Sequence, residues 1–181
     1  MAPTFKDMTN FIIAAGAADI SHTKGTYLAH AIGVYNDMKA WGEDDALCRA
    51  ALFHSIYGTE GFQDFTLPLE RRGELEALIG KRAERLAYYN CAMDRASLDA
   101  HLDETRDTYP ILDRLTGQEV ELSPAEYDDL CRVHLCDLLE QVARADVWNY
   151  RREAYRKMAE RLGGVALEAY DRVFAKEPRP Q

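Results

Sequence analysis

Residues 27–34 read Tyr-Leu-Ala-His-Ala-Ile-Gly-Val, and residues 50–54 read Ala-Ala-Leu-Phe-His. Apart from one histidine in each and the tyrosine that opens the first, both stretches are apolar, which is typical of helical segments buried on most sides. A buried imidazole needs a polar partner, because leaving it unpaired costs about 1–3 kcal/mol. The two segments therefore predict a helical core that contains His30 and His54.

Helical patterns continue on both sides of these segments. The expected helices span residues 5–18, about 21–40, 43–56, 69–78, 81–93, 97–105, 124–145, 149–162 and 165–174. Ser123, followed by proline and then by Glu126, is typical of a capped helix start. The only strand-like signal lies at 115–122, where Thr116-Gly117-Gln118 suits the turn of a small hairpin. We expect a single all-α domain over residues 1–176 and a frayed tail over 177–181.

Composition limits the classes of function. The chain has 181 residues, 47% of them apolar, and a formal net charge of −9 with no long basic run. This balance argues against a nucleic-acid-binding surface, which needs clustered Lys and Arg. The apolar stretch 11–18 is far shorter than the roughly 20 residues of a membrane span, and the N-terminus lacks a signal-peptide pattern, so we expect no membrane association and a cytoplasmic location. The four cysteines form no CxxC pair, which favours reduced, buried thiols.

Histidine spacing suggests a metal site. His22 and His30 are eight residues apart, which places them about 80° apart if they share one helix. Together with His54 and with Asp137, which lies in a polar stripe of the 124–145 helix, they offer ligands that suit Mn, Fe or Zn. Spacing alone leaves the alternative open that these histidines only form hydrogen bonds inside a helical core.

The histidine segments resemble the start of HD-domain hydrolases, nearest the guanosine-tetraphosphate (ppGpp) hydrolase type. The resemblance extends over about residues 20–145 and includes 75–80, similar to a turn of that family, and 135–141, similar to its Leu-Ala-Asp-x-x-x-Asn segment. It implies an HD-like helical bundle and a divalent metal. It also implies that three family ligands are present, namely His30, His54 and Asp137.

The chemistry of that family is incompletely matched. The family has an aspartate directly after the second histidine, and this chain has Ser55 there. The family then has a Glu-Asp pair a few residues later, whereas the corresponding stretch 56–60 contains a single acidic residue, Glu60. Serine is a poor ligand for a divalent ion, so we expect weaker metal binding. The segment His-Ser-x-Tyr-Gly-Thr indicates a separate HD-like branch, in which His22 would be an added pocket residue.

We therefore expect an enzyme that hydrolyses a small anionic or phosphorylated molecule with a divalent metal. The expected catalytic residues are His22, Ser55, Glu60 and Glu140, and the expected substrate-binding residues are Tyr57, Thr59, Arg71 and Gln141. Three alternatives stay open: an iron-dependent oxygenase, a metal-free acid–base enzyme, and a non-catalytic ligand-binding domain. The sequence also leaves open a homodimer or a partner chain that completes the site.

Overall fold

The computed structural model describes residues 3–22 and 24–178, with only the backbone described for His22. The helices are α1 (Phe5–Ala14), α2 (Tyr27–Ala40), α3 (Asp45–Leu52), a 3-10 turn η1 (Leu69–Arg71), α4 (Arg72–Ile79), α5 (Lys81–Ala92), α6 (Arg95–Asp99), α7 (Pro124–Ala145), α8 (Arg152–Leu162) and α9 (Gly164–Phe174). Two antiparallel strand pairs accompany them: β1 (Ser21–His22) with β2 (Gly25–Thr26), and β3 (Tyr109–Asp113) with β4 (Gln118–Leu122). The expected mostly helical fold with a small hairpin is confirmed.

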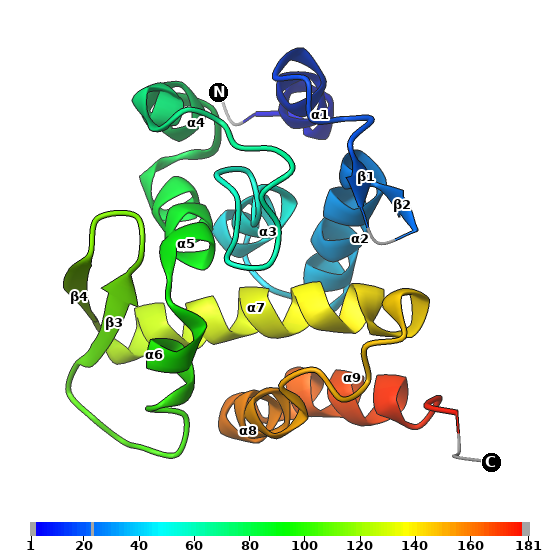
Figure 1. Cartoon of the computed structure of the whole chain (residues 1–181), viewed down its shortest axis with the longest axis vertical. Coiled ribbons are helices and arrows are strands. Elements are labelled where there is room, and N and C mark those ends of the chain that lie inside the picture. The colour runs from blue at the N-terminus through cyan, green and yellow to red at the C-terminus, as the bar shows by residue number, and fades with distance from the viewer. Residues whose placement is uncertain (1–2, 23, 179–181) are drawn as a thin grey trace.

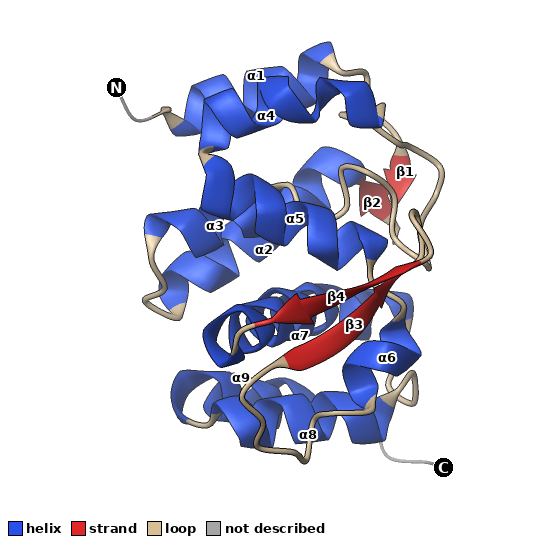
Figure 2. Cartoon of the chain, turned by 90° about the vertical axis from the view of Figure 1, so that its left-hand side faces the viewer, coloured by secondary structure: helices blue, strands red, loops and turns tan. Residues whose placement is uncertain are grey.

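The helices are stacked in tiers (Figure 2). α1 and α4 lie at one end, and α2, α3 and α5 form the next tier. α7 crosses beneath that tier, with the β3–β4 hairpin beside it, and α8 and α9 close the other end (Figure 1). Because α7 contacts α2, α3, α5, α8 and α9, it joins the two halves of the core.

Local capping explains why α7 begins where it does. The Ser123 side chain accepts a hydrogen bond from the Glu126 backbone N–H, and the Glu126 carboxylate accepts one from the Ser123 backbone N–H. This capping box satisfies two of the amides that a helix start leaves without partners. Both predicted ends of this helix, 124 and 145, are confirmed.

The start of α2 differs from the prediction. A Thr26 side chain caps the helix, which therefore begins at Tyr27, while His22 lies in β1 and pairs with Gly25. His22 and His30 are consequently not on one helix, and the angular argument that joined them is wrong. Leu28, Ile32 and Tyr35 of this helix are partly buried and pack against the edge of the core. The buried residues are Tyr27, His30, Ala31, Val34 and Met38.

Two other segments differ as well. The hairpin begins at Tyr109, six residues before the predicted 115–122, with Tyr109 paired to Leu122 and Asp113 to Gln118. Pro110 is tolerated because a two-stranded ribbon leaves one edge of each strand without a ladder partner. At the C-terminus, where the sequence predicts a frayed tail over 177–181, Glu177 forms an ion pair with Arg152. Residues 179–181 of that tail lie outside the described residues.

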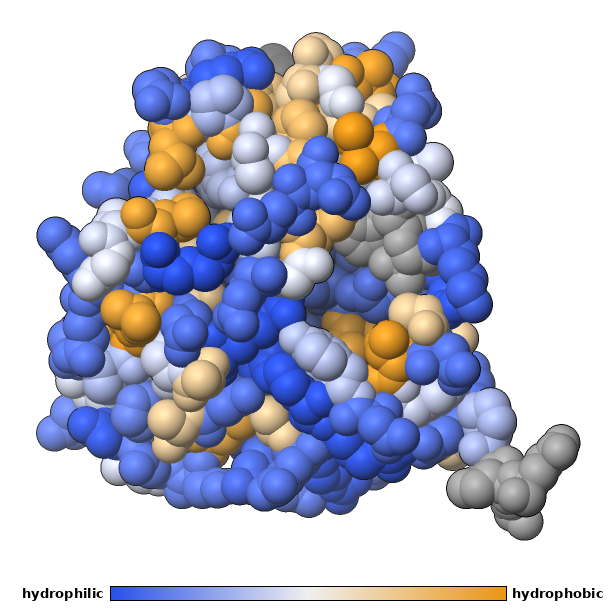
Figure 3. Space-filling model, viewed as in Figure 1, coloured by the Kyte–Doolittle hydropathy of each residue, from blue (hydrophilic) through white to orange (hydrophobic). Residues whose placement is uncertain are grey.

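Hydrophilic side chains cover most of one broad face, with apolar side chains in small scattered groups (Figure 3). All four cysteines are free thiols and are buried, as expected. Within the described part of the chain, no helix is long and apolar enough to cross a membrane.

Candidate metal centre and its pocket

Three donor atoms from three helical segments converge at the junction of α2, α3 and α7. The Nε2 atom of His30 lies 3.1 Å from Nε2 of His54 and 3.0 Å from Oδ1 of Asp137. The His54 Nε2 atom lies 3.3 Å from the same carboxylate oxygen. All three side chains are buried. This is the ligand set that the resemblance implied.

The backbone orients His54. α3 ends at Leu52, and the His54 ring follows in the next turn, where its Nδ1–H donates to the Ala51 carbonyl at 2.8 Å. In the neutral ring this hydrogen bond leaves a lone pair on Nε2. The Asn90 side chain in turn donates to the His54 carbonyl at 2.7 Å, which ties the turn to α5.

A carboxylate orients His30 in the same way. Oε2 of Glu140 lies 2.5 Å from Nδ1 of His30, and Arg144 binds both carboxylate oxygens of Glu140 at 2.9 and 2.6 Å. Burial disfavours a charged His30, but the hydrogen bonds and charges of Asp137 and Glu140 outweigh it and raise the His30 pKa to about 9. The surroundings of Nε2 therefore favour a positive charge.

Asp137 supplies the negative charge between the two rings. Burial alone would raise its pKa, but His54 and His30 hold the pKa of Asp137 well below its usual range. The Gln141 side chain, one turn further along α7, donates to Oδ1 at 2.7 Å. The carboxylate is thus ionised and held in one orientation.

These residues fit a divalent transition metal. Bonds of about 2.0–2.2 Å at ordinary coordination angles separate neighbouring donor atoms by about 2.9–3.5 Å, and the observed separations of 3.0, 3.1 and 3.3 Å fall in that range. Metal-binding histidines almost always donate their second N–H to a carbonyl or carboxylate. His54 and His30 do so, to Ala51 and Glu140 respectively.

Ser55 stands where the resemblance places an aspartate. Its side chain is buried, lines the cavity beside His54 and lies next to the Tyr27 hydroxyl. Being neutral, it leaves Asp137 as the only carboxylate of the converging set among the described residues.

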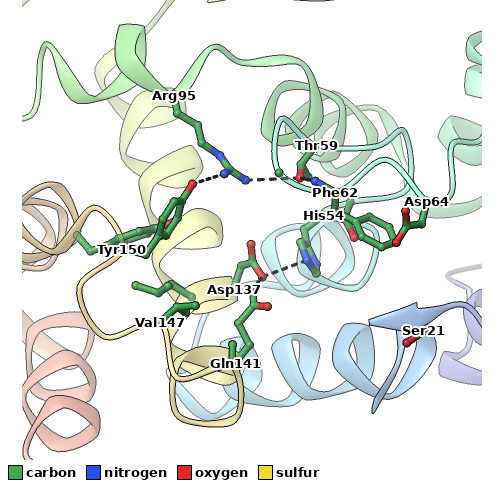
Figure 4. Close-up of a pocket in the computed structure, with 15 residues that line it drawn as sticks. Ser21, His54, Thr59, Phe62, Asp64, Arg95, Asp137, Gln141, Val147 and Tyr150 are labelled. Atoms are coloured by element: carbon green, nitrogen blue, oxygen red, sulfur yellow. Dashed lines mark hydrogen bonds and ion pairs between the residues drawn. The ribbon is translucent and has the colours of Figure 1, made fainter. Parts of the chain in front are cut away.

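A pocket of about 410 Å³ opens beside the converging donors (Figure 4). Its lining residues are Ser21, His54, Ser55, Thr59, Gly61, Phe62, Asp64, Arg95, Asp137, Leu138, Gln141, Ala145, Val147, Tyr150 and Tyr155. Three of the residues predicted from sequence as catalytic or substrate-binding, Ser55, Thr59 and Gln141, therefore lie in its wall. Glu140 lies behind His30 as its hydrogen-bond partner.

Three further predicted residues, Tyr57, Glu60 and Arg71, do not lie in the pocket wall. The Tyr57 hydroxyl donates to buried Glu84 at 2.8 Å, so this tyrosine belongs to the core. Arg71 pairs with Glu74 on an exposed helix face, and the Glu60 carboxylate accepts the backbone N–H of Arg95 at 2.9 Å. These placements do not support direct catalytic or substrate contacts. The His22 side chain lies outside the described residues.

The pocket wall also contains residues that the sequence did not predict, among them Arg95, Tyr150 and Tyr155. Arg95 lies between the expected helices 81–93 and 97–105, and neither tyrosine belongs to a motif that indicates a binding role. An arginine beside a single acidic residue, as in Asp94-Arg95, carries no signal of its own. Only the packing of α6 against the 146–151 segment places it here.

Comparison with known proteins gives one partial match. A family model described as a domain of unknown function (DUF6817) matches residues 11–95, from within α1 to the first residue of α6. The match includes His30 and His54 but ends before Asp137. Searches among curated proteins and among solved structures found no match.

Proposed function

We propose that this protein is an HD-like, divalent-metal-dependent hydrolase of a small molecule, with His30, His54 and Asp137 as metal ligands. The observation that carries the proposal is the convergence of three donor atoms within 3.3 Å, each already oriented by a further hydrogen bond. The order of the three ligands along the chain, and their resemblance to the HD hydrolases, favour hydrolysis.

The chain's own residues have distinct tasks in this proposal. Glu140 and the Ala51 carbonyl hold the imidazoles in the orientation that directs Nε2 of each ring to one point. Gln141 holds Asp137, while Ser55 and Thr59 border the space where a substrate would lie. A bound divalent ion would supply Lewis-acid polarisation and a water of lowered pKa.

Charge also favours this chemistry. With an ion bound, the donor set would consist of two neutral imidazoles and one carboxylate, because metal binding displaces the proton from a ligating histidine, and a divalent ion would then keep a net charge of about +1 there. With the family's second aspartate the same centre would be neutral. The loss of that aspartate therefore lowers the expected affinity for the metal and raises the attraction for an anionic oxygen.

Metal content is the decisive test. We expect untagged protein, purified without chelators, to carry about one Mn, Fe or Zn per chain by elemental analysis, and to lose it in His30→Ala and His54→Ala. His101→Ala is a matched control, because that histidine pairs with Glu104 on a polar turn away from the centre. A folded protein that binds none of the three metals after equilibration would contradict the proposal.

Activity is tested separately, with the metal-loaded protein and a panel of phosphorylated small molecules. We expect release of phosphate or of a hydrolysed product, and its loss in His54→Ala. Full metal occupancy without turnover of any substrate would favour a ligand-binding domain.

One observation favours a second candidate function. Two histidines and one carboxylate that leave further coordination positions open form the ligand set of non-haem Fe(II) oxygenases. An oxygenase would purify with iron in preference to Mn or Zn, and would consume O₂ when supplied with its substrate. Iron-specific occupancy with substrate-dependent oxygen uptake would replace hydrolysis by oxidation.

A further inference from the structure

Arg95 projects from α6 into the space bordered by Thr59, Asp137 and Tyr150 (Figure 4). One guanidinium nitrogen, Nη1, donates to the Tyr150 hydroxyl, and the other, Nη2, lies 3.5 Å from Oγ1 of Thr59. Both partners are neutral hydroxyl groups. The cation therefore faces the same pocket as the metal donors.

Most arginines of this chain are neutralised by carboxylates, but Arg95 is not. Arg72 pairs with Glu84, Arg151 with Asp99 and Arg161 with Asp128. Among the described residues, Arg95 forms no ion pair with a carboxylate. The nearby Glu60 carboxylate accepts the backbone N–H of Arg95 instead of its guanidinium. Since its partners are neutral, the positive charge of this guanidinium is not compensated within the pocket. Its planar set of N–H donors can bind an incoming oxyanion.

Neighbouring loops leave room for this side chain. At Gly61 an added Cβ would lie 2.9 Å from Nη1 of Arg95, so the absence of a side chain lets the guanidinium lie against the 59–62 turn. The Thr59 hydroxyl also accepts the Phe62 backbone N–H at 3.1 Å, which fixes that turn.

The segment that carries Tyr150, on the opposite wall, is held in place at its Arg151 end. Asp146 and Arg151 have left-handed backbone angles, φ 56° and φ 42°, at the two ends of the segment that carries Tyr150. Non-glycine residues adopt such angles where surrounding contacts impose them. Arg151 supplies those contacts through a two-point ion pair with Asp99 on α6 and a 2.7 Å hydrogen bond to Nε2 of His134 on α7.

We infer that Arg95 is the receptor for an oxyanion group, a phosphate or a carboxylate, of the small molecule that enters this pocket. Thr59 and Tyr150 hold the guanidinium in place before the ligand arrives, and the ligand's oxyanion would take up the charge that no carboxylate of the pocket neutralises. The role of this subsite in a reaction rests on the proposed function, whereas anion binding itself does not.

The test uses metal-free, full-length protein, so that it is independent of the metal proposal. Inorganic phosphate and acetate are titrated separately while the Arg95 Nε–H resonance is followed by NMR, with the resonance assigned from its loss in Arg95→Lys. We expect Arg95→Gln to weaken binding of the preferred anion at least about tenfold. We expect Arg95→Lys, which keeps the charge but loses the planar fork, to weaken it less.

Two controls separate the possible causes. Arg172→Gln removes the same charge from an exposed position on α9 and should leave anion affinity unchanged. His54→Ala should abolish metal binding but retain anion binding by the metal-free protein. This outcome distinguishes failure of the metal site from failure of the anion subsite.

Preference for phosphate would support a phosphorylated ligand, and preference for acetate a carboxylate ligand. The inference is overturned if folded Arg95→Gln and Arg95→Lys both bind the anions as tightly as the wild type. It is equally overturned if neither anion perturbs the Arg95 resonance at millimolar concentrations.

Discussion

The Glu140 carboxylate occupies the space that a side chain at position 33 would need. A Cβ on Gly33 would lie 2.6 Å from Oε1 of Glu140 and 2.9 Å from its Cδ and Cγ atoms. Gly33 is one turn after His30 on α2, so its lack of a side chain opens the path by which Glu140 reaches Nδ1 of His30. A glycine inside a helix costs about 0.5–1 kcal/mol relative to alanine, and here that cost accompanies the orientation of a ligand.

Gly33→Ala should therefore displace Glu140 without unfolding the protein, because a flexible carboxylate can move aside. We expect metal affinity to fall about 10- to 100-fold, as is usual when a ligand's hydrogen-bond partner is lost. Metal titration and thermal unfolding would measure the two effects. The matched control is Gly73→Ala in α4, where an added Cβ meets nothing within 4 Å. Equal metal affinity in both variants would refute the orienting role of Glu140.

Ser55→Asp should restore a fourth ligand at the cost of stability without metal. The new carboxylate would be buried, and an uncompensated buried charge costs several kcal/mol. We expect a lower melting temperature for the metal-free variant and a larger rise on adding Mn²⁺ than in the wild type. Ser55→Asn, which has the same shape but no charge, should show the destabilisation in weaker form and no gain in metal response. A Ser55→Asp protein with an unchanged metal response would show that residue 55 does not reach the ion.

Replacing Arg72 by methionine should lower the free energy of unfolding much more than replacing Arg71 by methionine. Arg72 binds both carboxylate oxygens of Glu84, whose side chain is 2% exposed and also accepts the Tyr57 hydroxyl. Removing Arg72 leaves a buried charge without its cation, and we expect a loss of about 3 kcal/mol in the free energy of unfolding.

Arg71→Met is the matched control, because the pair with Glu74 is exposed and such pairs contribute about 0–1 kcal/mol. Chemical denaturation of both variants would give the comparison. Similar losses would mean that the Glu84 network contributes no more than a surface pair.

His134 should make the metal-free protein sensitive to mild acid. Burial and then the charge of Arg151 hold the His134 pKa well below 6.5 in the folded state, whereas the unfolded chain has the ordinary value. The unfolded state therefore binds the extra proton, and stability should decline as the pH falls below about 6.5, by up to about 1.4 kcal/mol per pH unit. His30 opposes this slope near pH 6.5, because its raised pKa keeps it protonated in the folded state while the unfolded chain is only partly protonated. Its contribution disappears about one pH unit lower, where both states are protonated, so the decline from His134 is steepest there.

Chemical denaturation curves recorded between about pH 7 and pH 5 would measure how the free energy of unfolding changes with pH. Most carboxylates stay ionised in this range, because their ordinary pKa values are about 4. His134→Gln keeps an acceptor for Arg151 and should abolish the decline in stability at acid pH, whereas His101→Gln should retain that decline. An unaltered slope in His134→Gln would assign the acid sensitivity to other groups.

Local signals predicted much of the fold correctly. The ends of α7 follow from Ser123, Glu126 and the apolar pattern between them, which act within one or a few turns of the chain. The buried 50–54 run and its terminal histidine were likewise predicted, because a nearly continuous apolar stretch has no solvent-facing side. Strand pairing was the source of the error at the hairpin: β3 is a strand because it pairs with β4, and nothing inside Tyr109–Asp113 indicates that partner.

The candidate site also has a part that the sequence could predict and a part that only the packing of the helices decided. His30, His54 and Asp137 could be proposed from residue types, their order and a resemblance, since each lies in a segment with its own pattern. Their meeting within 3.3 Å was decided by the packing of α2 and α3 on α7. The sequence could not tell Arg71, on the surface, from Arg95, in the pocket.

By itself, then, the sequence determined the helical class, the long helix α7 and the burial of two histidines, because capping and periodicity act between residues close in the chain. Only the tertiary structure decided which polar groups share a pocket. It brought Glu140 to His30 across Gly33, paired Arg72 with Glu84, and left Arg95 facing the metal donors with only hydroxyl partners among the described residues. Those relationships depend on distances between segments up to about a hundred residues apart, which are set by how the helices pack and not by the chain locally.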